Sequence, residues 1–291
     1  MSVDMLQEKI RRVKNPSVVD LYASPEQIPQ KILEENGDYF AAYESYCISL
    51  MEGLKGTVPA VRFSFPTFAL LGEKGLALLK KLLLQAKQYD YYVLLDGPEA
   101  LSGMSAAQNA KLLLSGESGL CFDGLILSSY IGSDGIRPYA QLLKDSEKGL
   151  FVVVRTANRS APEIQDLLTG SRLVHAAKTD IVNRLADTLI GKSGYSQIAA
   201  MASASSAESL RTLRSKYKYI FLLLDGYDYP NANAKNCAEA FDRLGHGAAA
   251  CAGGSVVAAW QEMTDEPDPI VCAVQAAQRM KKNITRYITV L

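Results

Sequence analysis

Acidic side chains follow two apolar runs of this sequence, at 91–95 and 219–224, where buried strands would end. The four carboxylates are Asp96, Glu99, Asp225 and Asp228. Carboxyl groups held near one another can serve as general acid and general base, because their surroundings can shift their pKa values apart. These residues are therefore candidates for acid–base chemistry.

Other residues near these positions allow different interpretations. Asp96 precedes a Gly-Pro turn, and an aspartate in such a place commonly caps local backbone amides. Three arginines could hold an anionic ligand near the same loops: Arg62, Arg155 and Arg159. Arg155 and Arg159 could equally be solvated loop residues.

Eight short apolar runs, separated by helical stretches, must position these side chains. The runs lie at 17–21, 58–65, 91–95, 124–128, 150–154, 198–202, 219–224 and 247–252. Their length and nearly continuous apolar character are typical of parallel strands that are buried on both faces. Helices are predicted at 72–88, 206–217 and 268–284, and residues 25–55 are predicted to form an unusually long helical segment.

The repeated alternation of strand and helix predicts an α/β fold. With no linker and no break in composition, the pattern favours one (β/α)8 barrel, a TIM barrel with extra helices, as a single domain over residues 1–291. A doubly wound open sheet is the alternative. In a barrel the loops after the carboxyl ends of the strands carry the chemistry.

Composition limits the function classes. The 31 Lys and Arg residues balance 31 Asp and Glu residues, so no net field attracts nucleic acid or an anionic membrane. The five cysteines lack metal or redox spacing, and His175 and His246 have no partner at a known site spacing. No run approaches the ~20 apolar residues of a membrane span, and no signal-peptide core is present. We therefore expect a cytoplasmic protein without a metal site.

A resemblance to a known family lies at residues 129–167. This segment resembles orotidine 5′-phosphate decarboxylase of the longer bacterial type at Tyr130, Gly132, Ser133, Asp134, Gly135, Pro138, Thr156, Asn158, Gln165 and Asp166. The similarity continues through 15–29, 194–205 and 221–260. It implies a (β/α)8 barrel, a homodimer and a reaction without a cofactor that converts orotidine monophosphate to UMP and carbon dioxide.

The catalytic motif that the resemblance implies, D-x-K-x-x-D after the third strand, is altered here. Asp96 matches the first aspartate, but Pro98 stands at the lysine position and Leu101 at the second aspartate position. In the family that lysine protonates the carbanion left by decarboxylation. Neither proline nor leucine carries a transferable proton or a charge.

The first two strands differ from the family pattern as well. Arg62 corresponds to the family's lysine on the second strand and keeps only the charge, since a guanidinium does not give up its proton. The aspartate expected after the first strand is replaced by Tyr22, with Asp20 two positions earlier.

The ligand-binding positions implied by the resemblance are partly kept. Thr156, Asn158, Gly226 and Tyr227 match the family loops that hold the pyrimidine and the phosphate. Ala157, Pro230 and Gly254 replace the family's serine, phosphate-binding glutamine and phosphate-binding arginine. Remote phosphate contacts support the chemical step, so their loss is expected to reduce turnover as well as affinity.

The sequence therefore predicts a non-catalytic or repurposed paralogue of orotidine 5′-phosphate decarboxylase that binds a small anionic or nucleotide ligand. Three alternatives stay open: a weak but authentic decarboxylase that makes UMP, a binding or regulatory subunit that pairs with an active decarboxylase, and an enzyme of altered chemistry that uses the four carboxylates.

Overall fold

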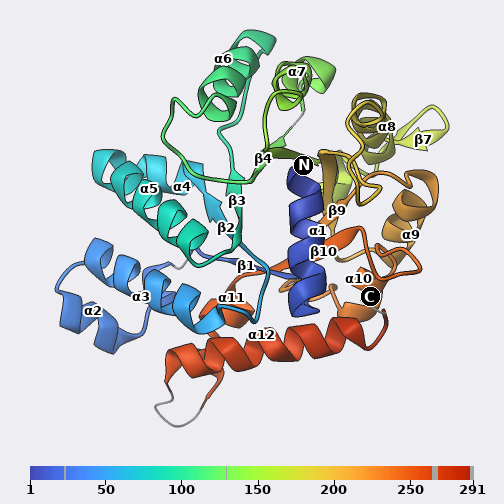
Figure 1. Cartoon of the computed structure of the whole chain (residues 1–291). Coiled ribbons are helices and arrows are strands. Elements are labelled where there is room, and N and C mark those ends of the chain that lie inside the picture. Colours follow the sequence, from blue (N-terminus) through green and yellow to red (C-terminus); the bar gives the residue numbers. More distant parts are fainter. Residues whose placement is uncertain (23, 129, 264–267, 289–291) are drawn as a thin grey trace.

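Eight parallel strands form a closed barrel in the order β1-β10-β9-β8-β5-β4-β3-β2 (Figure 1). The computed structural model describes residues 1–22, 24–128, 130–263 and 268–288. The barrel strands are β1 (Ser17–Asp20), β2 (Ala60–Ser64), β3 (Tyr92–Asp96), β4 (Gly124–Ser128), β5 (Gly149–Val153), β8 (Ile198–Ser203), β9 (Leu222–Asp225) and β10 (Ala248–Ala252). Because β1 pairs with both β2 and β10, the predicted TIM barrel is confirmed and the open sheet is wrong.

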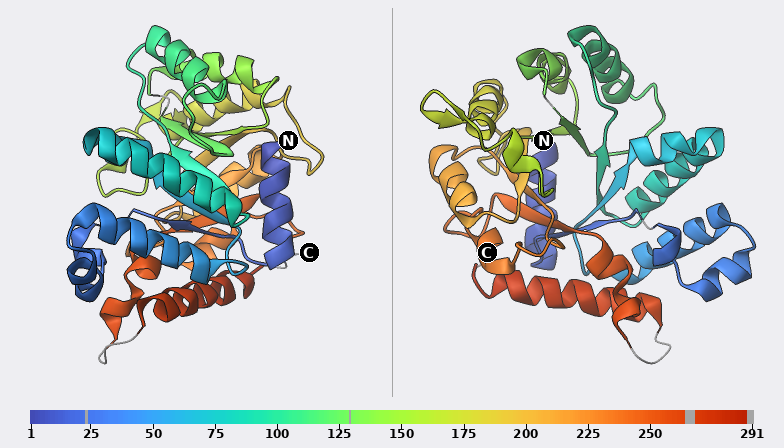
Figure 2. Two further views of the ribbon diagram at one scale, coloured as in Figure 1. Left: turned by 60° about the vertical axis from the view of Figure 1, so that its left-hand side comes forward. Right: turned by 180° about the vertical axis from the view of Figure 1, so that it is seen from behind.

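Helices surround the strands on the outside of the barrel (Figure 2). They are α2 (Gln30–Asn36), α3 (Tyr39–Leu54), α4 (Phe65–Leu70), α5 (Gly72–Gln88), α6 (Gly103–Leu114), α7 (Arg137–Leu143), α8 (Val174–Ala186), α9 (Ala207–Lys216), α10 (Ala234–Ala238), α11 (Gly254–Val257) and α12 (Pro269–Thr285). A small hairpin, β6 (Leu168–Thr169) with β7 (Arg172–Leu173), precedes α8. None of the described helices has the length and apolar character that crossing a membrane requires. Residue 291, the end of the predicted domain, lies outside the described residues.

The segment 25–55 is largely helical, as predicted, but it is divided into a 3-10 turn at 25–27 and the two helices α2 and α3. Gly37 ends α2 in the left-handed conformation, with φ of 74°, which glycine adopts without steric cost. Asp38 then begins α3, its side chain accepting a hydrogen bond from the Ala41 amide.

Helix α1 (Ser2–Val13) covers the amino-terminal end of the barrel and was not predicted from the sequence. Its side chains Val3, Leu6 and Ile10 are fully buried in the cluster that fills the barrel interior. The Ser2 hydroxyl lies 2.7 Å from the hydroxyl of Tyr92, at the start of β3. The opposite end of the barrel, where the strands finish, is therefore the open one.

The interior of the barrel is filled by a row of aromatic rings. Tyr92, Phe151, Phe221 and Tyr195 meet edge to face, with ring centroids 6.0 to 6.5 Å apart. Such contacts bury large apolar areas in a defined geometry. The rings fill the interior of the barrel, and the polar residues at the carboxyl ends of the strands lie beyond them.

Candidate functional site

Arg62 lies at the centre of the mouth of the barrel, the end formed by the carboxyl ends of the strands. Its Nε and Nη2 donate to the two carboxylate oxygens of Asp96 at 2.9 and 3.0 Å. Its Nη1 donates to Asp225 at 2.9 Å and to Asp20 at 3.4 Å. One guanidinium is therefore shared by three carboxylates, which we call the Arg62 network.

The barrel explains why these four residues meet. Asp20, Asp96 and Asp225 are the last residues of β1, β3 and β9, and Arg62 lies within β2. Since all these strands run in parallel, their last side chains collect at one end of the barrel. Arg62 is paired in register with Asp20 of β1, which brings that carboxylate beside it.

Burial and charge act against each other in the Arg62 network. Burial raises the pKa of Asp20 to about 7, and Asp225 and Asp96 add to this shift, while Arg62 opposes it. Burial alone would lower the pKa of Arg62, but Asp20, Tyr22 and Asp96 raise it well above its usual value. Oδ1 of Asp20 is buried and has no hydrogen-bond partner among the described residues. The network therefore holds more negative charge than one arginine can balance.

Tyr22 completes the network from the loop after β1. Its hydroxyl donates to Asp96 at 3.2 Å, and its ring lies 5.5 Å from the Arg62 guanidinium. In the described part of the chain, the hydrogen bonds of Asp96 go to Arg62 and Tyr22 and not to backbone amides. The interpretation of Asp96 as a cap of the Gly-Pro turn is therefore wrong.

A cavity of about 260 Å³, the mouth cavity, opens beside the Arg62 network. Its charged and hydroxyl-bearing lining residues are Arg62, Arg155, Asp96, Glu99, Asp225, Ser64, Ser128 and Thr156. Sequence reasoning did not select Ser64, Ser128 or the apolar lining residue Met201. The signal was faint: Ser64 and Ser128 are the last residues of β2 and β4, where an apolar run first turns polar.

The loop after β5 is held by two polar residues further along the chain. Arg155 donates to both oxygens of Asp166 at 2.9 Å, and its side chain is 11% exposed, so it is not a solvated loop residue. Gln165 accepts from the Thr156 amide at 2.8 Å and donates to the Thr156 hydroxyl at 2.7 Å. By contrast, Arg159 is exposed.

The other residues predicted to bind ligand lie outside the mouth cavity. Asn158 is exposed and accepts a hydrogen bond from the Thr156 hydroxyl at 2.5 Å. Gly226, with φ of 77°, approaches Ala157 so closely that a Cβ would lie 2.3 Å from the alanine methyl. Tyr227 packs against the outer core. Of the residues selected from the sequence, the structure thus brings six together at the cavity: Arg62, Asp96, Glu99, Arg155, Thr156 and Asp225.

The loops after β9 and β10 are joined by Asp228. Its Oδ2 accepts from the amides of Gly253 at 2.7 Å and Ser255 at 3.4 Å. The Ser255 hydroxyl donates to the other oxygen. Gly254 lies between these donors, at the start of α11, and Pro230 is exposed. A carboxylate of the chain itself therefore occupies the amide donors of these two loops.

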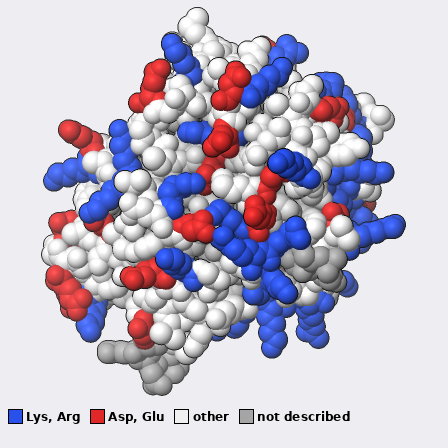
Figure 3. All heavy atoms as spheres, viewed as in Figure 1, with Lys and Arg blue, Asp and Glu red and all other residues white. Residues whose placement is uncertain are grey.

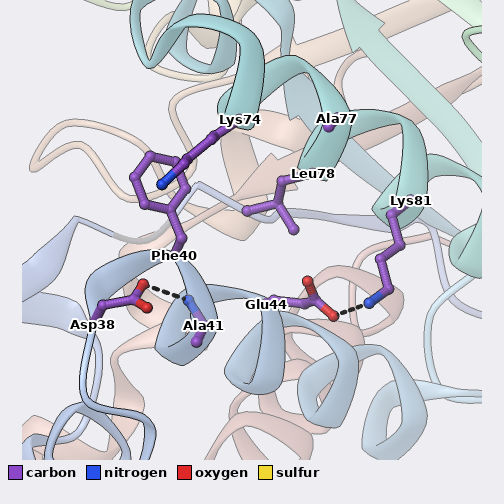
Figure 4. Close-up of a pocket in the computed structure, with 8 residues that line it drawn as sticks. All are labelled: Asp38, Phe40, Ala41, Glu44, Lys74, Ala77, Leu78 and Lys81. Carbon is purple, nitrogen blue, oxygen red and sulfur yellow. Dashed lines mark hydrogen bonds and ion pairs between the residues drawn. The ribbon is translucent and has the colours of Figure 1, made fainter.

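A larger cavity, of about 640 Å³, lies outside the barrel between α3 and α5 (Figure 4). Three of its four charged side chains are bonded within the protein: Asp38 accepts from the Ala41 amide, and Glu44 pairs with Lys81. None of the residues in the Arg62 network lines it. Since barrel chemistry lies at the carboxyl ends of the strands, the mouth cavity is the better candidate site.

Comparison with known proteins agrees with the fold. No family model matches the chain. The chain is 27% identical over 252 residues to the orotidine 5′-phosphate decarboxylase of Rhodopirellula baltica, covering 84% of this chain and 83% of the relative. It is 26% identical over 290 residues to that of Clostridium perfringens, covering 99% of each. The solved structure of Leishmania donovani OMP decarboxylase, 19% identical, matches 98% of both chains with a TM-score of 0.72 and shares the fold.

Proposed function

We propose that this member of the orotidine 5′-phosphate decarboxylase family is a non-catalytic or repurposed barrel that does not turn over orotidine monophosphate at an enzyme's rate. The observation that supports the proposal is which cations are present at the mouth and what they are bonded to. Arg62 is bonded to three carboxylates, and no lysine lines the mouth cavity among the described residues.

The proposed loss follows from the chemistry of proton donation. Decarboxylation leaves a carbanion that must be protonated, and the resemblance assigns this step to a lysine where Pro98 stands. Arg62 cannot take over, because its pKa is raised and its donors already face carboxylates. Loss of a proton-transfer group typically lowers a rate by ~10²–10⁴-fold.

Phosphate binding is proposed to be lost as well. The resemblance places a phosphate at the loops after β9 and β10, where Pro230 and Gly254 replace the binding glutamine and arginine. Asp228 accepts hydrogen bonds from the amides of Gly253 and Ser255 in these loops. A phosphate there would meet a carboxylate in place of free donors, so binding energy that could support catalysis is missing.

The test is an absorbance assay with purified protein and orotidine monophosphate, with the Clostridium perfringens relative assayed in parallel. We expect loss of the substrate's ultraviolet absorbance with the relative and none above the uncatalysed rate with this protein. Turnover at a rate near that of the relative would support the alternative of an authentic decarboxylase.

We also propose that the protein forms a homodimer through the rim of the mouth. Large apolar side chains stand out from the loops and helices after β2 to β5, each 73 to 89% exposed: Leu70, Leu101, Met104, Tyr130 and Leu168. We propose that these side chains together form one apolar patch, since contiguous exposed apolar patches mark protein interfaces. The same surface favours the second candidate function, a regulatory subunit that pairs with an active decarboxylase.

The proposed location is the cytoplasm. All five cysteines are free and four of them are buried, which suits a reducing compartment.

A further inference from the structure

Both cations that line the mouth cavity are already matched by carboxylates. Arg62 is bonded to Asp96, Asp225 and Asp20, and Arg155 is bonded through two nitrogens to Asp166. Neither guanidinium is left as an unpaired charge for a ligand. An anion entering this cavity would displace an internal carboxylate or remain beside it, and both cost free energy.

Carboxylate oxygens, by contrast, remain without hydrogen bonds. Glu99 is exposed at the rim of the cavity and makes no ion pair within the described part of the chain, although it raises the pKa of Lys178 against the lowering effect of burial. Asp225 uses Oδ1 for Arg62, and its Oδ2 has no partner among the described residues. Both residues line the cavity.

Asp20 is a further carboxyl group bonded to Arg62, behind the residues that line the cavity. The residue is 8% exposed, and its Oδ1 is buried without a partner in the described structure. It shares Nη1 of Arg62 with Asp225, which lines the cavity, whereas Asp20 itself does not. A buried carboxylate oxygen is stabilised by a nearby positive charge.

Lys and Arg side chains gather on the face that carries α1, mainly in the lower right part of Figure 3. That face is the closed end of the barrel, opposite the mouth. In the lining of the mouth cavity, on the other side of the molecule, three carboxylates stand against two arginines.

The remaining walls of the cavity are aliphatic. Ile126, Val153 and Met201 line it, and no aromatic residue does so among the described ones. A flat ring would find no stacking partner here, whereas methylene groups would contact these side chains and leave water. The volume of about 260 Å³ suits a small compound.

From these observations we propose that the mouth cavity binds a small aliphatic amine, with its ammonium group held by Glu99 and Asp225 and its methylene groups against Ile126, Val153 and Met201. The inference rests on the proposed function, because it names the ligand class of the repurposed mouth. An anionic or nucleotide ligand, which the sequence predicts, is the opposite charge class and is a competing outcome.

Three compounds with the same four-carbon chain separate charge from shape: putrescine, butane-1,4-diol and succinate. We expect putrescine alone to raise the melting temperature of the protein and to give a heat of binding, because a ligand that binds only the folded state stabilises it. The effect of putrescine should shrink as salt is raised. UMP and inorganic phosphate are included as anions and should have no effect.

Two variants test the binding residues. Glu99→Gln, at an exposed position, should raise the putrescine Kd about fivefold, the fold-change that loss of a rim ion pair gives. Asp225→Asn should weaken binding further. The matched control, Glu163→Gln, removes the same charge from an exposed position outside the cavity and should leave the Kd unchanged.

Several results would overturn the inference. Stabilisation by succinate, phosphate or UMP without stabilisation by putrescine would assign the mouth to anions. No response to putrescine, or equal binding in Glu99→Gln, Glu163→Gln and the unmodified protein, would remove the proposed contact. If Asp225→Asn does not fold, Glu99→Gln alone decides. The decarboxylation assay is separate, so an inactive protein that ignores putrescine would contradict this inference and not the proposed function.

Discussion

Arg62 and Asp96 are joined by two parallel hydrogen bonds, Nε to Oδ1 at 2.9 Å and Nη2 to Oδ2 at 3.0 Å, which link β2 to β3 at the mouth of the barrel. Paired bonds between a guanidinium and a carboxylate fix both groups in one plane. Asp96 is therefore held as a partner of Arg62 and is not free to approach a substrate. A lysine could not reproduce this geometry, because its ammonium group has no planar pair of donors.

Replacing Arg62 should destabilise the fold strongly. Arg62→Ala leaves Asp20, Asp96 and Asp225 without their shared cation, and breaking a buried ion pair from one side costs about 3–5 kcal/mol. The control is Arg12→Ala, which removes an exposed pair with Asp90 and should cost at most about 1 kcal/mol. Urea denaturation measures both. Equal losses in the two variants would show that the Arg62 network is not a stabilising unit.

The raised pKa of Asp20 predicts a loss of stability as the pH rises. The carboxyl has a pKa of about 7 in the folded protein and 3.8 as its reference value, so the folded state binds the proton more tightly. The free energy of unfolding should therefore fall between about pH 4 and 7, by at most about 4 kcal/mol from this group.

Asp20→Asn isolates this contribution. Buried His175 acts in the opposite direction over part of the range, since burial lowers its pKa, so the difference between the protein and its variant is the useful quantity. The free energy of unfolding of Asp20→Asn, relative to that of the unmodified protein, should therefore increase with increasing pH. Parallel stability curves for the two proteins from pH 4 to 8 would show that Asp20 does not titrate in this window.

Asp228→Ala should restore a place for phosphate. The change frees the amides of Gly253 and Ser255 and the Ser255 hydroxyl, and it removes a negative charge beside them. We expect UMP to raise the melting temperature of the variant but not of the unmodified protein. Asp134→Ala, which removes a carboxylate from another loop of the mouth, is the control. UMP protection of the unmodified protein would mean that Asp228 does not block the site.

Charges placed on the apolar rim should separate a dimer. Leu101→Glu combined with Met104→Glu puts carboxylates on side chains that are 86 and 75% exposed, and a buried interface does not accommodate unpaired charges. Sedimentation should change from dimer to monomer. Leu84→Glu, on the outer side of α5 and 50% exposed, should leave the dimer intact. A monomeric unmodified protein at micromolar concentration would contradict the dimer.

The barrel could be predicted from the sequence because its strands have a local signature. Each strand is a short, nearly continuous apolar run, and the eight predicted runs all overlap strands of the barrel. The position of α1 could not be predicted in this way, since its burial depends on contacts with residues such as Tyr92 that are far along the chain. The break at Gly37 depends on one left-handed residue within a segment that otherwise favours helix.

The site was only partly predictable for a similar reason. Arg62, Asp96 and Thr156 follow from strand ends and from the resemblance, and the structure brings them to one cavity. Their partners depend on contacts across the barrel: Asp225 reaches Arg62 from 163 positions away, and Asp228 reaches Gly253 and Ser255 from the neighbouring loop. Local sequence patterns do not show which carboxylate will pair with which arginine or backbone amide in the folded chain.

A single-turnover assay, with the protein in excess over orotidine monophosphate, tests the central claim most directly. Under these conditions even a slow enzyme converts all of its substrate, and weak binding is overcome by concentration. We predict that the ultraviolet absorbance stays at the level of the protein-free control while the Clostridium perfringens relative consumes the substrate completely. Complete conversion to UMP by this protein, at a rate proportional to its concentration, would contradict the account.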